Sequence, residues 1–178
     1  MDKIVWKGDV FSPYGDSVEA VTRPLLLNYS QQRPDLFDFV HSTCSNCPGH
    51  SMPEQVARYA SVLDIGGAGL SGRLKYLLFS RRPLYLVDRH CVEYFHSDLV
   101  PYQHYIPVLE NLTDLEAQAE WGRSHRAEAR TIAENAFQFA TTHFRKDRLV
   151  QRMRSVMLSQ CEPIKPRRRD SPTASDTP

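Results

Sequence analysis

The sequence predicts an α/β fold, a Rossmann-like parallel sheet with helices on both faces and a helical C-terminal end. Two observations predict it: short apolar segments alternate with helical ones, and a glycine-rich turn follows one apolar segment. Such alternation is typical of a parallel sheet covered on both faces. The chain has 178 residues, of which 41% are hydrophobic. This is enough for one packed core and too little for two full-sized domains.

Each predicted element follows from its local pattern. Five apolar runs predict strands at residues 4–6, 36–40, 61–65, 83–87 and 105–108, and Pro107 places the last at an edge or a strand end. Helices are expected at residues 17–29, 53–59, 70–80, 114–121, 127–143 and 146–158. Pro24 is unfavourable in the first helix unless it lies in the first turn. We therefore expect one domain over residues 1–160 and a disordered, Pro-, Arg- and Ser-rich tail over residues 161–178.

Charge and hydropathy exclude several classes of protein. The formal net charge of +1 indicates neither a nucleic-acid binder nor a binder of acidic surfaces. No stretch approaches the roughly 20 apolar residues that span a bilayer. The first residues lack the basic start and apolar core of a secretory signal. As it stands the sequence predicts a cytoplasmic protein, and a missing upstream region would make the secretory pathway possible.

The cysteines raise the question of a metal site. Cys44 and Cys47 are separated by two residues and followed by His50. A four-ligand zinc site usually needs a second pair at similar spacing. The other candidates are isolated: His41, His90 and Cys91. We expect no metal and no chemistry at this pair, and a disulfide only in an oxidising compartment.

The glycine turn supports two interpretations. Residues 67–72 spell G-x-G-x-x-G between a predicted strand and a predicted helix. Glycines let a backbone approach a pyrophosphate, and a helix N-terminus offers unpaired N–H groups. Asp88 ends the next strand about 20 residues on, where a dinucleotide-binding fold places its ribose-binding acid. The motif alone therefore favours an NAD- or FAD-dependent oxidoreductase, with a purely structural turn as the alternative.

Two neighbouring cations fit the dinucleotide interpretation poorly. Arg73 and Lys75 lie just inside the predicted helix, where Arg73 offers a fork to a diphosphate and Lys75 a point charge. Two strand-like segments also precede the motif, whereas a dinucleotide fingerprint usually stands near the start of its domain. An exposed helix face is the alternative for both side chains.

Two longer blocks resemble a known family. Residues 63–78 resemble the central motif of glycosyltransferase family 90, of the Rumi and capsule-associated type: a strand, a glycine turn, then Ser-x-Arg-x-Lys. Residues 93–108 are similar to the aromatic block that follows it there, which ends in His-Tyr-x-Pro. Trp6-Lys7-Gly8 resembles the family's Trp-Arg-Gly. The resemblance covers residues 3–160.

The resemblance implies the C-terminal, donor-binding half of a two-domain GT-B enzyme. Such a half binds a UDP-sugar, whose glucosyl or xylosyl group passes to a hydroxyl of a glycan or protein acceptor. It implies donor-binding roles for Gly66, Gly67, Gly69, Ser71, Arg73 and Lys75, and weaker ones for Gly8 and Arg23. UDP-sugar is then a co-substrate, with no cofactor, and the lack of Asp-x-Asp indicates no obligatory metal ion.

Three departures from the family pattern limit this expectation. Lys7 replaces an arginine, Ala136 replaces a glycine, and nothing matches the acidic catalytic residue of the acceptor domain. An inactive sugar-nucleotide-binding fragment is therefore the alternative, and the catalytic residue stays unknown. The carboxylates Asp64, Glu93 and Asp98 cannot be placed as a base. Aromatic residues of the second block either line the donor pocket or pack between sheet and helices: Tyr94, Phe95, Tyr102, His104 and Tyr105.

Overall fold

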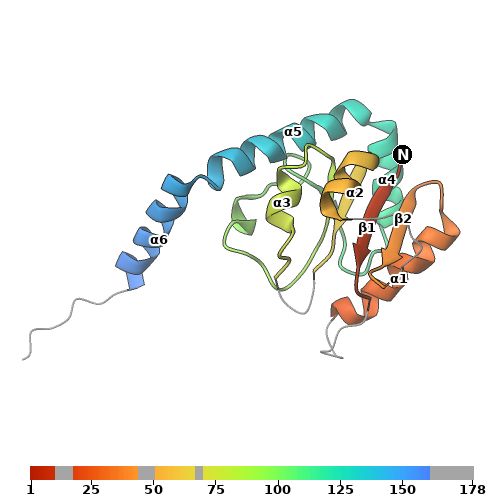
Figure 1. Cartoon of the computed structure of the whole chain (residues 1–178), viewed down its shortest axis with the longest axis horizontal. Helices are drawn as coiled ribbons and strands as arrows, with labels where there is room; N and C mark the ends of the chain where they lie inside the picture. Colours follow the sequence, from red (N-terminus) through yellow and green to blue (C-terminus); the bar gives the residue numbers. More distant parts are fainter. Residues whose placement is uncertain (11–17, 44–50, 67–69, 161–178) are drawn as a thin grey trace, which may run out of the picture. The chain divides into compact units, whose positions relative to one another are not determined.

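The computed structural model describes residues 1–10, 18–43, 51–66 and 70–160 (Figure 1). Several sequence predictions lie outside these ranges: the tail 161–178, the pair Cys44 and Cys47, and the glycines Gly67 and Gly69. The chain divides into two units, Met1–His143 and Phe144–Pro178. None of the described helices has the length and apolar character needed to cross a membrane.

The first unit is built on a parallel sheet of five strands. They are β1 (Ile4–Gly8), β2 (Phe37–His41), β3 (Ser61–Asp64), β4 (Leu84–Val87) and β5 (Ile106–Val108). Their order in the sheet is β2-β1-β3-β4-β5, and all neighbours run parallel. The predicted parallel α/β sheet is thereby confirmed, and Pro107 lies on edge strand β5.

The strand order defines where a ligand is expected. The chain adds β2 on one side of β1 and then adds β3, β4 and β5 on the other side. Sheets of this kind bind ligands in the crevice outside the carboxyl ends of the strands, where the direction of growth reverses. Here that position lies at the ends of β1 and β3.

The register divides the sheet into two faces. Leu63 pairs with Tyr85, and Tyr85 pairs with Ile106, so these buried side chains share one face with Trp6. This face forms one hydrophobic cluster with residues of α1 (Val18–Gln32) and α4 (Leu115–Ser124). The connections from β2 to β3 and from β3 to β4 run across the sheet in the direction opposite to that from β1 to β2. Because such crossovers are right-handed, α2 (Met52–Arg58) and α3 (Leu74–Leu78) lie on the other face. There α2 contacts β3, and α3 contacts α5 (Arg126–His143).

Two helix predictions need correction. The helix expected over residues 70–80 is only α3, five residues long, with Arg73 as its N-cap. The turn before it continues to Arg73 because the side chains of Ser71 and Arg73 bond to Asp64. Pro24 lies in the second turn of α1 and not in the first, because α1 begins at Val18. The proline removes one backbone N–H from that helix.

The other helices confirm their predictions with shifted ends. α2 carries its proline near the N-terminus, and α4 begins after Asp114. α5 is the longest helix described, with 18 residues, and buries a row of small and apolar side chains. In the second unit, α6 covers Lys146–Gln160.

Candidate functional site at the carboxyl ends of β1 and β3

A buried carboxylate organises the carboxyl ends of β1 and β3, where the strand order places the expected crevice. Asp64, the last residue of β3, has no solvent-exposed surface. Its Oδ1 accepts hydrogen bonds from the Ser71 hydroxyl at 2.8 Å and from Arg73 Nε at 3.1 Å. Arg89 Nη1 lies 2.9 Å from Oδ2. A buried charge needs such partners, so the turn, β3 and the segment after β4 are tied to one group.

Arg89 supports Asp64 from within the protein. Its side chain is 2% exposed. Nη2 donates to the Asp64 carbonyl oxygen at 3.0 Å, and Nε donates to the Val87 carbonyl oxygen at 3.1 Å. The sequence interpretation selected the adjacent Asp88 and missed Arg89. The available signal was a charged residue just after a buried apolar strand, at the ligand-binding edge.

Arg73 joins the two strands that flank the crevice. Besides Asp64, its Nη1 donates to the Lys7 carbonyl oxygen at 2.7 Å, and its guanidinium lies 5.6 Å from the centre of the Trp6 ring. The side chain remains 26% exposed. A guanidinium has five N–H donors, so these bonds leave N–H groups on Nη1 and Nη2 for a further acceptor.

Arg23 ties the same strand ends together from α1. Nε donates to the Gly66 carbonyl oxygen at 2.9 Å, and Nη2 donates to the same oxygen. Nη1 donates to the Asp9 carbonyl oxygen at 2.9 Å. Its guanidinium lies 5.9 Å from the Trp6 ring centre. Arg23 and Gly66 therefore belong to the site, and Arg23 directs its donors at protein carbonyls.

Gly8 is explained by the ring of Trp6. A Cβ atom at Gly8 would lie 2.5 Å from Cζ2 of Trp6, well inside van der Waals contact. Trp6 is fully buried. The Trp-Lys-Gly sequence thus lets the end of β1 lie directly on the indole that both arginines flank.

The other predicted site residues are placed differently. Ser71 is buried and gives its one hydroxyl proton to Asp64, so in this arrangement the hydroxyl holds the turn. The Lys75 ammonium lies 5.5 Å from the ring centre of Tyr76 and makes no ion pair with Asp64. A Cβ added at Gly72 would meet no atom within 4 Å, so open space adjoins the turn there.

A cavity of about 340 Å³ opens nearby, at the carboxyl ends of β4 and β5. Asp88, His96 and Tyr105 are among its lining residues. His96 Nδ1 accepts a hydrogen bond from the Glu93 N–H at 3.0 Å, while its buried Nε2 has no hydrogen-bond partner in the described part of the chain. Burial, followed by the charge of Arg89, lowers the pKa of His96. The His96 imidazole therefore favours the neutral form, with its proton on the buried Nε2.

The aromatic residues of the second block divide between the two predicted roles. Tyr105 lines the cavity, and burial followed by the charge of Asp88 raises its pKa. His104 instead packs on Phe139, with 5.1 Å between ring centres. Tyr102 packs on Trp121 at 5.4 Å. These contacts fit the packing interpretation for His104, whereas the Tyr102 side chain is about half exposed.

The structure assigns no catalytic base. Both oxygens of Asp64 are engaged by cations, which leaves this carboxylate a structural role. Within the described ranges, no three His, Cys, Asp or Glu residues come together as a metal site would require. Cys91 is an exposed free thiol.

The sequence pattern of Glycosyl transferase family 90 matches residues 15–173. This chain belongs to glycosyltransferase family 90. The matched range includes the glycine turn, Arg73 and Arg89. The oxidoreductase interpretation of residues 67–72 and Asp88 gains no support from it.

Several known proteins are similar to part of this chain. Protein O-glucosyltransferase 2 of Danio rerio is 34% identical over 90 residues, which are 51% of this chain and 18% of that protein. The O-glucosyltransferase rumi homolog of Anopheles gambiae is 26% identical over 148 residues, 80% of this chain and 37% of that protein. Uncharacterized protein 035R of Invertebrate iridescent virus 3 is 33% identical over 107 residues, 59% of this chain and 10% of that protein. The chain thus spans 10–37% of the length of these relatives.

Proposed function

We propose that this chain is the donor-binding half of a GT-B glycosyltransferase, with the diphosphate of a UDP-sugar bound at the carboxyl ends of β1 and β3. One observation carries the proposal: Arg73 is fixed at the switch point of the sheet by Asp64 and by the Lys7 carbonyl, yet stays 26% exposed. A planar, preoriented guanidinium suits the paired oxygens of a diphosphate.

The proposed role of Arg73 is to stabilise the leaving group. The acceptor hydroxyl attacks the anomeric carbon of the sugar, and the bond from that carbon to the β-phosphate oxygen breaks. The electron pair leaves with UDP, so negative charge grows on the diphosphate. Donors already aimed at that position lower the barrier because they need no reorganisation. Asp64, held by Arg89, supplies this orientation before the donor arrives.

The remaining residues of the turn have supporting roles in this proposal. Gly66 lets the backbone approach the diphosphate closely, a role that the family resemblance also implies for Gly67 and Gly69, and Ser71 anchors the turn on Asp64. Gly8 and Arg23 shape the floor around Trp6. Lys75 contributes only long-range charge. No metal ion and no cofactor take part.

The transferred sugar and its acceptor follow from the relatives. Two of the named relatives are O-glucosyltransferases, which supports glucose as the sugar. Xylose is the alternative implied by the family resemblance. We propose a hydroxyl of a protein or glycan as the acceptor, with its proton taken by a base outside this chain.

Binding of UDP tests the donor site. Isothermal titration should show UDP binding to the chain, with NAD and FAD inert. Arg73→Ala should weaken UDP binding by roughly tenfold or more, because a charge-assisted bond to the diphosphate is lost. Arg154→Ala, at an exposed position of α6, is the matched control and should bind as the parent does. Unchanged affinity in Arg73→Ala would remove the diphosphate from this crevice.

A second candidate is a binding module without transfer activity. The chain spans at most 37% of the relatives named above, and no base is assigned in it. Release of UDP from UDP-glucose, with and without an added protein acceptor, separates the candidates. UDP binding without release favours the module, whereas acceptor-dependent release favours an enzyme.

A further inference from the structure

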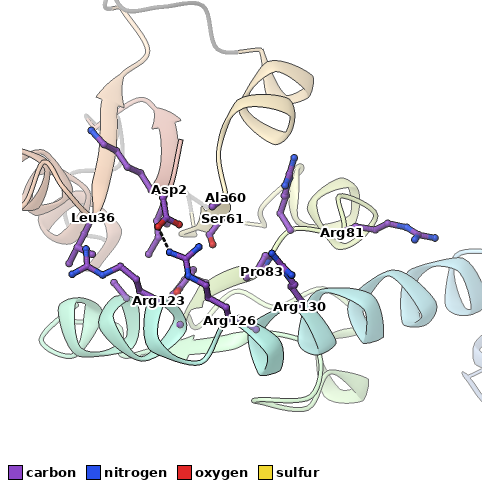
Figure 2. A pocket seen from close by; sticks show the side chains of 16 residues that line it. Asp2, Leu36, Ala60, Ser61, Arg81, Pro83, Arg123, Arg126 and Arg130 are labelled. Atoms are coloured by element: carbon purple, nitrogen blue, oxygen red, sulfur yellow. Dashed lines mark hydrogen bonds and ion pairs between the residues drawn. The ribbon is translucent and has the colours of Figure 1, made fainter.

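A second cavity of about 340 Å³ lies at the opposite, amino edge of the sheet (Figure 2). The starts of β1, β3 and β4 form one side of it, and α4 and α5 form the other. Asp64, Arg73 and Arg23 are absent from its lining, so it is separate from the crevice described above. Six cationic residues line it against the single carboxylate of Asp2: Lys3, Arg81, Arg82, Arg123, Arg126 and Arg130.

Half of these cations are already paired. Arg81 pairs with Glu134 at 3.2 Å, Arg123 with Asp35 at 3.3 Å, and Arg126 with Asp2. Lys3, Arg82 and Arg130 form no ion pair with any carboxylate in the described ranges. Arg82 donates from Nε to the Val56 carbonyl oxygen at 2.8 Å, which leaves its charge unbalanced. The cavity therefore holds an excess of positive charge.

The floor of the cavity holds a tyrosine side chain whose hydroxyl has no hydrogen-bond partner among the described residues. Tyr85 is 2% exposed and lines the cavity. Its hydroxyl makes no hydrogen bond within the part of the chain that the structure describes. The hydroxyl oxygen is not among the fully buried polar atoms that lack a partner, so it reaches the cavity, where it can bond to water or to a ligand. Burial, followed by the charge of Asp2, raises the pKa of Tyr85, so the hydroxyl keeps its proton and can donate.

Helix α4 packs closely against this hydroxyl on one side of the cavity. A Cβ atom at Gly122 of α4 would lie 2.1 Å from the Tyr85 hydroxyl oxygen, so only glycine allows the helix this close. Arg126 is the first residue of α5, an 18-residue helix. Its N-terminus adds partial positive charge and free N–H groups on the same side. In Figure 2, Arg126 and Arg130 project from α5 toward the strand starts near Ser61 and Pro83.

We propose that this cavity binds a small molecule carrying a phosphate or diphosphate group. Its oxygens accept hydrogen bonds from the Tyr85 hydroxyl and from the guanidinium groups of Arg130 and Arg82. The planar shape of these two groups matches phosphate geometry. Its organic part lies on the apolar floor that Ile4, Leu36 and Ala129 contribute. A volume of 340 Å³ lies within the range of small-molecule sites. This site is additional to the proposed donor site and does not depend on it.

Pyrophosphate titration in the Arg73→Ala background tests the proposal, because that change weakens phosphate binding in the donor crevice. We expect pyrophosphate to bind this variant and to shift the Nε–H signals of Arg82 and Arg130 in ¹⁵N NMR spectra. Adding Arg130→Gln or Tyr85→Phe should weaken binding by roughly tenfold, as loss of one bond to a charged group does. Adding Arg154→Gln, an exposed charge removed from the second unit, should leave affinity unchanged.

Several outcomes would overturn the proposal. Equal affinity in Arg130→Gln and Arg154→Gln would show that the cavity does not hold the phosphate. Binding to the parent chain that Arg73→Ala abolishes would assign all phosphate binding to the donor crevice. Binding of an oligo-glutamate peptide without binding of pyrophosphate would make the cavity a site for acidic polypeptide. If circular dichroism shows that Tyr85→Phe does not fold, the Arg130→Gln variant still tests the proposal, because Arg130 is exposed.

Discussion

Some side chains of the crevice could be predicted from the sequence and others could not. Ser71 and Arg73 were selected by residue type and spacing, and both lie in the crevice. Their shared bond to Asp64 could not be predicted, because it depends on how the turn folds back over β3. Arg89 and His96 were missed for a similar reason. Arg89 acquires its role only through Asp64, which is 25 residues away in the sequence, and a lone arginine or histidine carries no pattern of its own.

Gly8 gives the sharpest prediction at this scale. Gly8→Ala should lower the free energy of unfolding by about 1–3 kcal/mol, because its Cβ would overlap the buried Trp6 ring at 2.5 Å. Urea denaturation followed by circular dichroism measures this change. Gly72→Ala is the matched control, since its Cβ meets no atom within 4 Å and its φ is not positive. Its effect should stay within about 0.5 kcal/mol. Equal losses in both variants would refute the steric explanation of Gly8.

At the scale of elements, strands were easier to predict than the helix at the site. Buried parallel strands are continuous apolar runs, and each run in the sequence became a strand. The spacing of leucines extended α3 too far, because side chains bound to Asp64 hold residues 71–73 in a turn. The order of strands could not be predicted from local patterns. That order, and not the glycine motif, locates the crevice.

Arg33 forms ion pairs that link the segment after α1 to α4, and these pairs make the folding stability depend on pH in acid. It pairs with Asp35 at 2.9 Å, with Glu120 at 2.7 Å and with Glu116. Hydrogen bonding to Arg33 lowers the pKa of Asp35 from 3.8 to about 2. A carboxyl group with a depressed folded-state pKa stabilises above its unfolded pKa, and this contribution is lost as pH falls. The loss here falls between pH 3.8 and about 2.

Arg33→Ala should therefore flatten the decline in stability across that window. Melting temperatures measured from pH 6 to pH 2 test this, with Arg154→Ala as the exposed control. The parent and the control should lose stability below pH 3.8, and Arg33→Ala should start lower and lose less. Parallel curves for all three proteins would show that these ion pairs contribute nothing to acid sensitivity.

At the scale of the whole molecule, the core belongs to the first unit alone. The hydrophobic cluster extends from Ile4 to Ile132, within Met1–His143. In the second unit, α6 partly buries Leu149 and leaves its other five large apolar side chains at least half exposed: Val150, Met153, Val156, Met157 and Leu158. The sequence could not separate the units, because the helical pattern of α5 and α6 is nearly continuous.

A chain ending at His143 should keep its fold. Its unfolding should stay cooperative, and its melting temperature should change by less than about 4 °C, the shift that roughly 1 kcal/mol produces in a domain of this size. Differential scanning calorimetry of the full and shortened chains measures both properties. A broad, non-cooperative transition in the shortened chain would mean that residues 144–178 complete the core.

The position of Trp6 between two guanidinium groups gives the donor crevice an optical signal of its own. Its indole is fully buried, with Arg73 and Arg23 lying 5.6 and 5.9 Å from the ring centre. Emission from this indole depends on where those two charges stand. The chain has two tryptophans, and the other, Trp121, stacks on His125 in α4. In a Trp121→Phe variant, the tryptophan fluorescence comes from Trp6 alone. A ligand that moves the Arg73 guanidinium away from the ring should then change this emission, so binding can be followed without a label.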